Sequence, residues 1–193
     1  MEDEILFQGP GFTIARTLTP GTLVPYERMI RADGNINHGW IDLRGKPDRV
    51  TEIPEATKSK GLAELLRVIA DPRSKLLSGT CECAAFERGP NASGPQWQAG
   101  GFVTVMFGDA EKNVVAQNFV DLAQYILRGI PGAEDVHIGF EFLIEPLKLF
   151  FGRTDCYDLM VKPLGYGPDE HTAWAAFNYA SGAAAASIGR HLQ

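Results

Sequence analysis

Cysteine, histidine and carboxylate side chains are the groups in this 193-residue chain that could do chemistry, and two cysteines stand closest together. Cys81 and Cys83 lie in a run with the alternation of a β-strand, so both thiols are expected on one face. A Cys-x-Cys pair could bind a soft metal, but a structural zinc site needs four ligands and no partner pair stands nearby in the sequence. We therefore predict two small packed side chains and no metal site.

Histidines could supply the base of a thiol–imidazole pair if folding brought one of them beside a cysteine. No cysteine, however, has a glycine-flanked turn or a helix start next to it, the features that lower a thiol pKa. We therefore predict no catalytic residue, and an α+β hydrolase with a cysteine nucleophile remains the least favoured alternative. The histidines are His38, His137, His171 and His191.

Carboxylates give no clearer sign of catalysis. Glu141 and Glu145 are four residues apart in an expected strand, which puts them on one face but roughly 13 Å apart. That separation exceeds the usual distance between paired acid and base carboxylates. Asp155, Asp158 and the acids at 169–170 are expected in or beside turns. No phosphate loop or dinucleotide motif occurs either, so we predict no cofactor.

Composition describes an ordinary globular protein, with 45% hydrophobic and 22% charged residues. The net charge of -6 argues against tight binding of nucleic acid, which needs clustered lysine and arginine. Three cysteines, an odd number, fit a reducing compartment. The sequence shows no membrane-spanning apolar run and no secretory signal, so we expect a soluble protein made in the cytosol.

The clearest structural block runs over residues 61–107. It reads as a short amphipathic helix that ends at Asp71-Pro72, a strand over 76–87, a polar loop, and a second strand over 102–107. A longer helix is expected over 113–128, followed by more strands, the last of them over 172–180. Many short strands separated by glycine and proline turns favour a β-sandwich or closed barrel.

Two sites near the ends of the chain suggest proteolytic processing. Leu6-Phe7-Gln8-Gly9-Pro10 resembles a cut site of the chymotrypsin-like cysteine proteases of picorna-like viruses, and a terminal glutamine is what such an enzyme leaves on its upstream product. The candidate processing positions are Gln8, Gly9 and Gln193. An engineered tag site at 6–10 and a chance glutamine at 193 are the alternatives.

Four short segments resemble the small coat proteins of comovirus-like plant viruses, the Secoviridae. They are AELLRV at 63–68, SGTCEC at 78–83, QWQ at 96–98 and FVTVMF at 102–107. The family fold is a jelly roll, and its members are released from a polyprotein at glutamine sites. The resemblance therefore implies an all-β, eight-stranded antiparallel jelly-roll β-sandwich with one or two short helices in its connections.

On this basis, we expect one jelly-roll capsid domain over residues 1–193, with extended tails at about 1–11 and 181–193. The resemblance implies a structural coat protein without enzymatic activity, which assembles with sister subunits into an icosahedral shell. Its partners would be other capsid subunits, with RNA bound only weakly and no membrane contact. It would be made in the host cytoplasm and reside in the virion. The main rival is a carbohydrate- or ligand-binding β-sandwich that uses Trp97 or Trp174 for stacking.

Overall fold

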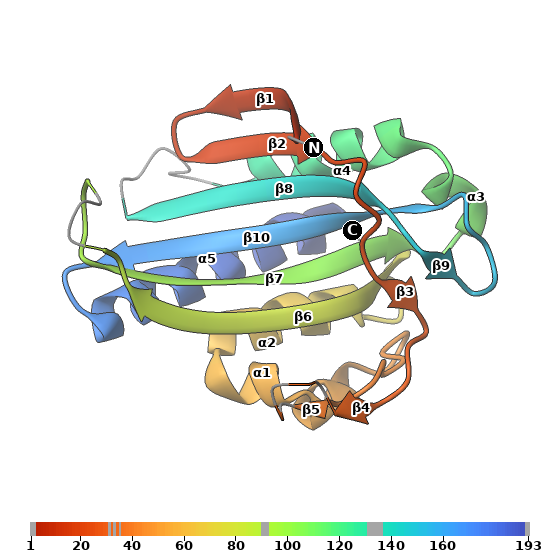
Figure 1. Ribbon diagram of the computed structural model, residues 1–193, viewed down its shortest axis with the longest axis horizontal. Coiled ribbons are helices and arrows are strands. Elements are labelled where there is room, and N and C mark those ends of the chain that lie inside the picture. Colours follow the sequence, from red (N-terminus) through yellow and green to blue (C-terminus); the bar gives the residue numbers. More distant parts are fainter. Residues whose placement is uncertain are drawn as a thin grey trace.

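The computed structural model describes residues 3–30, 32, 34, 36–89, 93–130 and 137–191, and a single mixed sheet dominates it (Figure 1). The strand order is β1-β2-β8-β10-β7-β6. Neighbouring strands are antiparallel except for β2 and β8, which run parallel. The strands are β1 (Glu4–Gly9), β2 (Phe12–Arg16), β6 (Leu76–Glu87), β7 (Trp97–Phe107), β8 (Ile138–Pro146) and β10 (Tyr157–Gly167).

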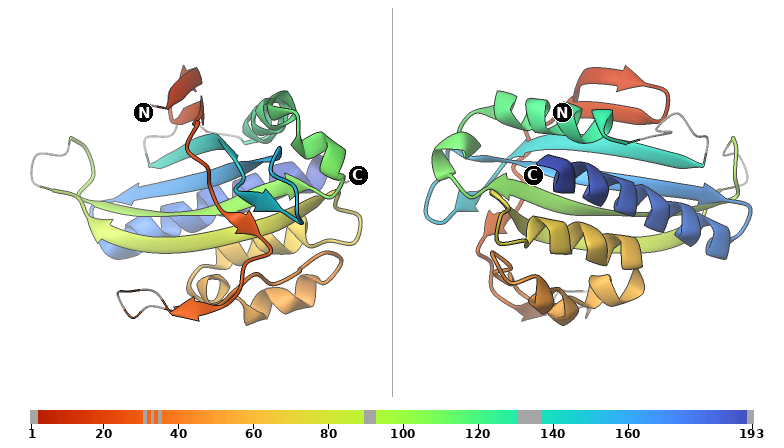
Figure 2. Two further views of the ribbon diagram at one scale, coloured as in Figure 1. Left: turned by 45° about the vertical axis from the view of Figure 1, so that its right-hand side comes forward. Right: turned by 180° about the vertical axis from the view of Figure 1, so that it is seen from behind.

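Helices form a second layer on one face of this sheet. In Figure 2, right, α2, α5 and α4 lie side by side across the back of the strands. The fold is therefore a two-layer α/β arrangement in which the helices bury one sheet face. The helices are η1 (Pro47–Glu52), α1 (Pro54–Lys58), α2 (Lys60–Ile69), α3 (Ala110–Asn113), α4 (Ala116–Arg128) and α5 (Glu170–His191).

The expected all-β, eight-stranded jelly-roll sandwich is wrong, because one sheet packs against helices where the sandwich would place a second sheet. The main cause is α5. Residues 172–180 were expected as a strand and 181–193 as part of a tail, but Glu170–His191 is one continuous helix. Its buried residues recur at helical spacing, and alanine is the best helix former. They include Ala173, Phe177, Ala180, Ala184 and Ile188.

Other local predictions are confirmed. The helix expected at the start of the 61–107 block is α2, and the strand expected over 76–87 is β6. The second strand is β7, which begins at Trp97, earlier than expected. The helix expected over 113–128 is α4, which begins at Ala116, and the short helix α3 precedes it. At the other end of the chain, most of the expected 1–11 tail forms β1 and its turn.

A polar junction fixes α2 against α5. The Ser59 hydroxyl accepts a hydrogen bond from the Leu62 N–H (3.0 Å) and donates one to Asn178 Oδ1 (2.8 Å). Asn178 Oδ1 also accepts from the Gly61 N–H (2.9 Å). A side chain at Gly61 would collide with the Asn178 backbone, so this glycine permits the close approach of the two helices.

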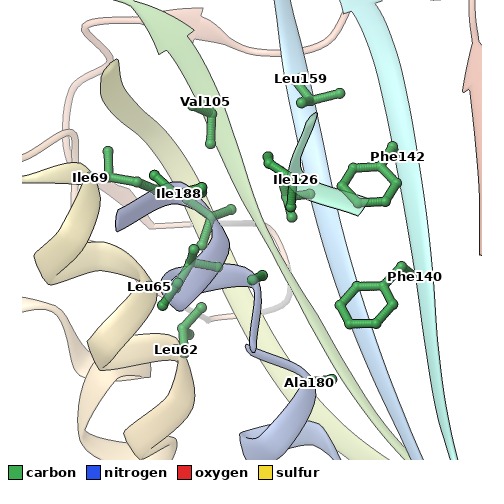
Figure 3. Packing of buried hydrophobic residues seen from close by; sticks show 14 of the residues in the cluster. Leu62, Leu65, Ile69, Val105, Ile126, Phe140, Phe142, Leu159, Ala180 and Ile188 are labelled. Carbon is green, nitrogen blue, oxygen red and sulfur yellow. The ribbon is translucent and has the colours of Figure 1, made fainter. Parts of the chain in front are cut away.

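The hydrophobic core lies between the sheet and the three helices. Figure 3 shows leucines and isoleucines of α2 and α5 facing the inward side chains of β7, β10 and β8. These side chains are almost fully buried, which makes this layer the main source of stability. They include Leu62, Leu65, Ile69, Val105, Ile126, Phe140, Phe142, Leu159 and Ile188.

A strap formed by residues 17–28 crosses the other sheet face. In Figure 1 it descends from the end of β2 across the front of the strands toward β4. Backbone hydrogen bonds hold it to the β8–β9 region, including Gly21 N–H to Pro146 O (2.8 Å) and Phe151 N–H to Val24 O (2.8 Å). Within it, β3 (Leu23–Val24) pairs in parallel with β9 (Leu149–Phe150). Beyond it, β4 (Met29–Ile30) and β5 (Ile36–Asn37) form a short antiparallel pair.

Candidate functional site

A groove of about 660 Å³ lies beside β6, the edge strand at one end of the sheet order. Its walls come from segments far apart in the sequence. One wall is formed by the strap, by the residues in and after β5, and by α1, and the other by one stretch of β6. Glu55 and Lys58 project from α1, and residues 78–83 of β6 line the opposite side. The other lining side chains are Thr22, Tyr26, Ile36, Asn37, His38, Ile41, Ile53, Pro54, Leu66 and Phe102.

The backbone of β6 presents unpaired groups to this groove. The Arg88 N–H donates to Gln96 O (2.7 Å), which marks these two residues as a hydrogen-bonded pair of the β6–β7 ladder. Because such pairs alternate along an antiparallel ladder, the N–H and C=O groups of Cys81, Cys83 and Ala85 point away from β7. Within the described ranges, none of these outward groups has a backbone partner.

Trp40 marks where this free edge begins. Its indole Nε1–H donates to the Ser78 carbonyl (2.9 Å), so the outward carbonyl there is already satisfied by the segment that follows β5. A bulge between Ser78 and Cys81 separates that contact from the free stretch. The available edge therefore starts at Cys81 and continues toward the end of the strand.

Both cysteines of the Cys-x-Cys pair line the groove from β6, as their expected placement on one face requires. Cys83 is buried, and its thiol lies 3.7 Å from the Glu55 carbonyl oxygen. Burial, and then the nearby Glu55 carboxylate, raise the pKa of Cys81 to about 12. Burial also raises the pKa of Cys83 to about 11, which Lys58 opposes. Both thiols are thus held in the protonated form.

Among the described residues, the third cysteine and two of the histidines lie away from the groove. Cys156 is buried in the small cluster beneath the strap, and burial raises its pKa as well. His38 is the histidine that shares the groove with Cys81 and Cys83. His137 precedes β8, and His171 is exposed at the start of α5. The side chain of His191 lies outside the described part of the chain.

Slow thiol alkylation is the expected consequence. At a pKa of about 11, the thiolate near pH 7.5 is on the order of a few parts in ten thousand, so iodoacetamide should label each groove thiol at least about tenfold more slowly than free cysteine. Mass spectrometry of the native protein measures these rates, and the urea-unfolded chain is the control. A thiol that reacts faster than free cysteine would revive the cysteine hydrolase alternative.

The two glutamates expected on one strand face do lie on the same face of β8, but their surroundings differ. Glu141 is exposed and forms an ion pair with Lys162. Glu145 is only 7% exposed, and it is the register partner of Asp158 on β10. Asp158, expected in or beside a turn, is a fully buried strand residue.

Asp158 is unusual for a fully buried residue because its side chain is a carboxylic acid. Neither of its carboxylate oxygens has a hydrogen-bond partner among the described residues. Burial, and then the Glu145 charge, raise the pKa of Asp158 well above its ordinary value. The strap packs directly over this pair, because a side chain at Gly21 would collide with the Glu145 carboxylate. Sequence reasoning missed this buried acid, since an aspartate near the start of a strand looks like a turn residue.

The candidate processing positions are only partly described. Gln8 is exposed and Gly9 half-buried at the end of β1, where they pair with Thr13 and Phe12. A protease that binds an extended substrate would need this hairpin to open. Gln193 lies outside the described residues.

The tryptophans proposed for stacking lie on separate elements. Trp97 begins β7 and Trp174 lies on α5, and both are half-buried against the main core. The Trp174 ring meets Phe177 edge to face at 5.6 Å. They form no shared platform within the groove.

Comparison with known proteins assigns no family: no protein-family model, curated protein or solved structure matches the chain. Across the described ranges, no three or more histidine, cysteine or acidic side chains gather in a group that could hold a metal ion. In the same ranges, no helix is long and apolar enough to cross a membrane.

Proposed function

We propose that the protein is a non-catalytic binding module that takes up an extended segment of a partner protein as an added strand beside β6. The observation that carries this proposal is the free outward edge at Cys81 and Cys83, which faces a groove with a second wall. Addition of a strand to an exposed sheet edge is a recurring mode of peptide recognition, in which backbone hydrogen bonds supply affinity and side-chain contacts supply specificity.

Backbone pairing alone would give weak binding. Each hydrogen bond gained contributes about 0.5–1.5 kcal/mol net, so the N–H and C=O groups of Cys81 and Cys83 together supply about 2–6 kcal/mol. The middle of that range corresponds to a dissociation constant of about 1 mM, before the cost of ordering the partner is subtracted. Side chains that line the groove must therefore provide the rest.

The protonated thiols support a role without catalysis, because a nucleophilic cysteine needs a lowered pKa. The capsid function expected from the sequence stays a prediction, but the jelly roll on which that expectation depended is absent from the described fold. A capsid subunit and a strand-binding module both work by contact with other proteins.

Peptides of about six residues, the length of an average strand, provide the test. We expect peptides selected from a phage-displayed library to bind, and their binding to shift the NMR amide signals of Cys81 and Cys83. The variant Cys81→Pro should abolish binding, because it removes an outward N–H without removing a bond to β7. Cys81→Val, which keeps the N–H, is the matched control.

A second arm leaves the protein unchanged. N-methylation of alternate peptide residues should block binding in one alternate set and spare it in the other, since only one set faces β6. Equal binding of both methylated sets, or of Cys81→Pro and Cys81→Val, would refute strand addition at β6.

A further inference from the structure

We infer that the segment bound at this groove carries two adjacent basic residues, one directed to Glu55 and the next to Glu82. This inference rests on the proposed function and concerns the chemistry of the partner. Both glutamates line the groove, Glu55 from α1 and Glu82 from β6 itself. Between them lies Cys81, the first residue of the free edge, and both carboxylates act electrostatically on its thiol.

Among the described residues that line the groove, these two are the acidic ones, and both are unpaired. In the described part of the chain, neither Glu55 nor Glu82 has a side-chain hydrogen bond or an ion pair. By contrast, six other acids of the described residues form ion pairs: Asp42 with Arg44, Glu52 with Arg49, Asp71 with Arg73, Glu111 and Asp155 with Arg153, and Glu141 with Lys162.

The groove also contains basic groups, but they are not paired with the two carboxylates. Lys58 and His38 also line the groove. Within the described ranges, neither forms an ion pair with Glu55 or Glu82. A partner with basic side chains would therefore complete the charges of the site, which favours such a partner over an acidic one.

The two glutamates lie on opposite sides of the plane in which an added strand would run. In the β6 register, Glu82 is opposite Phe102 and points to the sheet face that the helices leave open. Glu55 belongs to α1, and the Glu55 backbone carbonyl contacts the Cys83 thiol on the helix-covered side. Successive side chains of a strand point to opposite faces. Adjacent basic residues can therefore reach both glutamates, whereas basic residues two apart would reach one.

Three otherwise identical peptides test this inference by isothermal titration calorimetry. One carries a central Lys-Lys pair, the second Gln-Gln, and the third two lysines separated by threonine. We expect the adjacent pair to bind roughly tenfold more tightly than Gln-Gln and about threefold more tightly than the spaced pair, with the preference falling as salt is added.

Glu55→Gln and Glu82→Gln should each reduce the Lys-Lys preference about threefold, and the double variant should abolish it. Glu64→Gln, an exposed acid on α2 away from the groove, removes the same charge and should leave the preference unchanged. If Gln-Gln binds as tightly as Lys-Lys while the Cys81→Pro effect persists, the basic partner is refuted and strand addition stands. If no peptide binds, both proposals are refuted.

Discussion

Asp158→Asn is expected to raise the free energy of unfolding at pH 7 by about 2–4 kcal/mol. A carboxyl group that must stay protonated in the folded state costs about 1.4 kcal/mol for each pH unit above the ordinary aspartate pKa. Asp158 is fully buried, its oxygens lack partners in the described structure, and Glu145 lies beside it. Asparagine keeps the shape of the side chain and has no charge to suppress.

The sign of the pH dependence follows from the raised pKa of Asp158. Its contribution to stability is fully present below the pKa of the unfolded chain, near 4, and is lost as pH rises toward the folded-state pKa. Glu145 adds to the same trend, since burial and then the Asp3 charge raise its pKa, although Lys162 opposes them. The wild-type protein should therefore lose stability as the pH rises above about 4, and Asp158→Asn should lose less.

Urea unfolding at several pH values measures both effects. Asp48→Asn, which changes an exposed aspartate of η1, is the matched control and should follow the wild-type curve. An Asp158→Asn protein that is less stable than wild type at pH 7, with an unchanged pH slope, would contradict the assignment of a buried, protonated acid.

Gly165→Ala is expected to destabilise the fold by about 3 kcal/mol or more. A methyl group at Gly165 on β10 would meet backbone atoms of α5, including Ala173 O at 2.5 Å, and backbone cannot rotate away as a side chain can. Overpacking of a core costs about 1–3 kcal/mol even where side chains can adjust. Here the whole helix would have to lift from the sheet, which would open the layer that buries Phe177.

Thermal and urea unfolding test this prediction, with Gly139→Ala as the matched control. Gly139 lies on β8 with its missing side chain directed to the open face, and a methyl group there would make only ordinary contacts, at 3.5 Å to Tyr166. Gly139→Ala should thus remain within about 1 kcal/mol of wild type. Similar losses in the two variants would show that α5 does not depend on a close approach at Gly165.

Local periodicity explains which parts of the fold were predictable. Leu62, Leu65 and Ile69 recur at helical spacing, and the run over 76–87 alternates, so α2 and β6 could be assigned from the sequence. In α5, by contrast, half of the buried positions are alanines and its aromatic residues are interspersed with small ones, so the helical stripe is weak. Because α5 was predicted as a strand and a tail, the two other helices were interpreted as connections, and a second sheet was expected to cover the first.

The groove was less accessible to prediction than the fold. Cys81 and Cys83 could be placed on one face, because side chains two apart in a strand share a face. Their opposite wall comes from residues 22–41 and 53–58, and only the path of the strap brings those segments beside β6. The absence of a backbone partner at an edge depends on the order of the strands, which short-range patterns do not determine.

The parallel pairing of β2 with β8 has a consequence for how the chain could be divided. Residues 47–191 contain β8, β10, β7 and β6 in consecutive order across the sheet, together with every helix of the described structure. Residues 3–45 add to this body from outside, as a hairpin on one edge and a strap over one face (Figure 1). The amino-terminal segment thus adds strands to the sheet from within the same chain. If that segment were removed and supplied as a separate peptide, it would find the edge of β8 exposed and could pair with it. At one end of the sheet the chain supplies its own edge strand, β1, and at the other end we propose that a different molecule adds to β6.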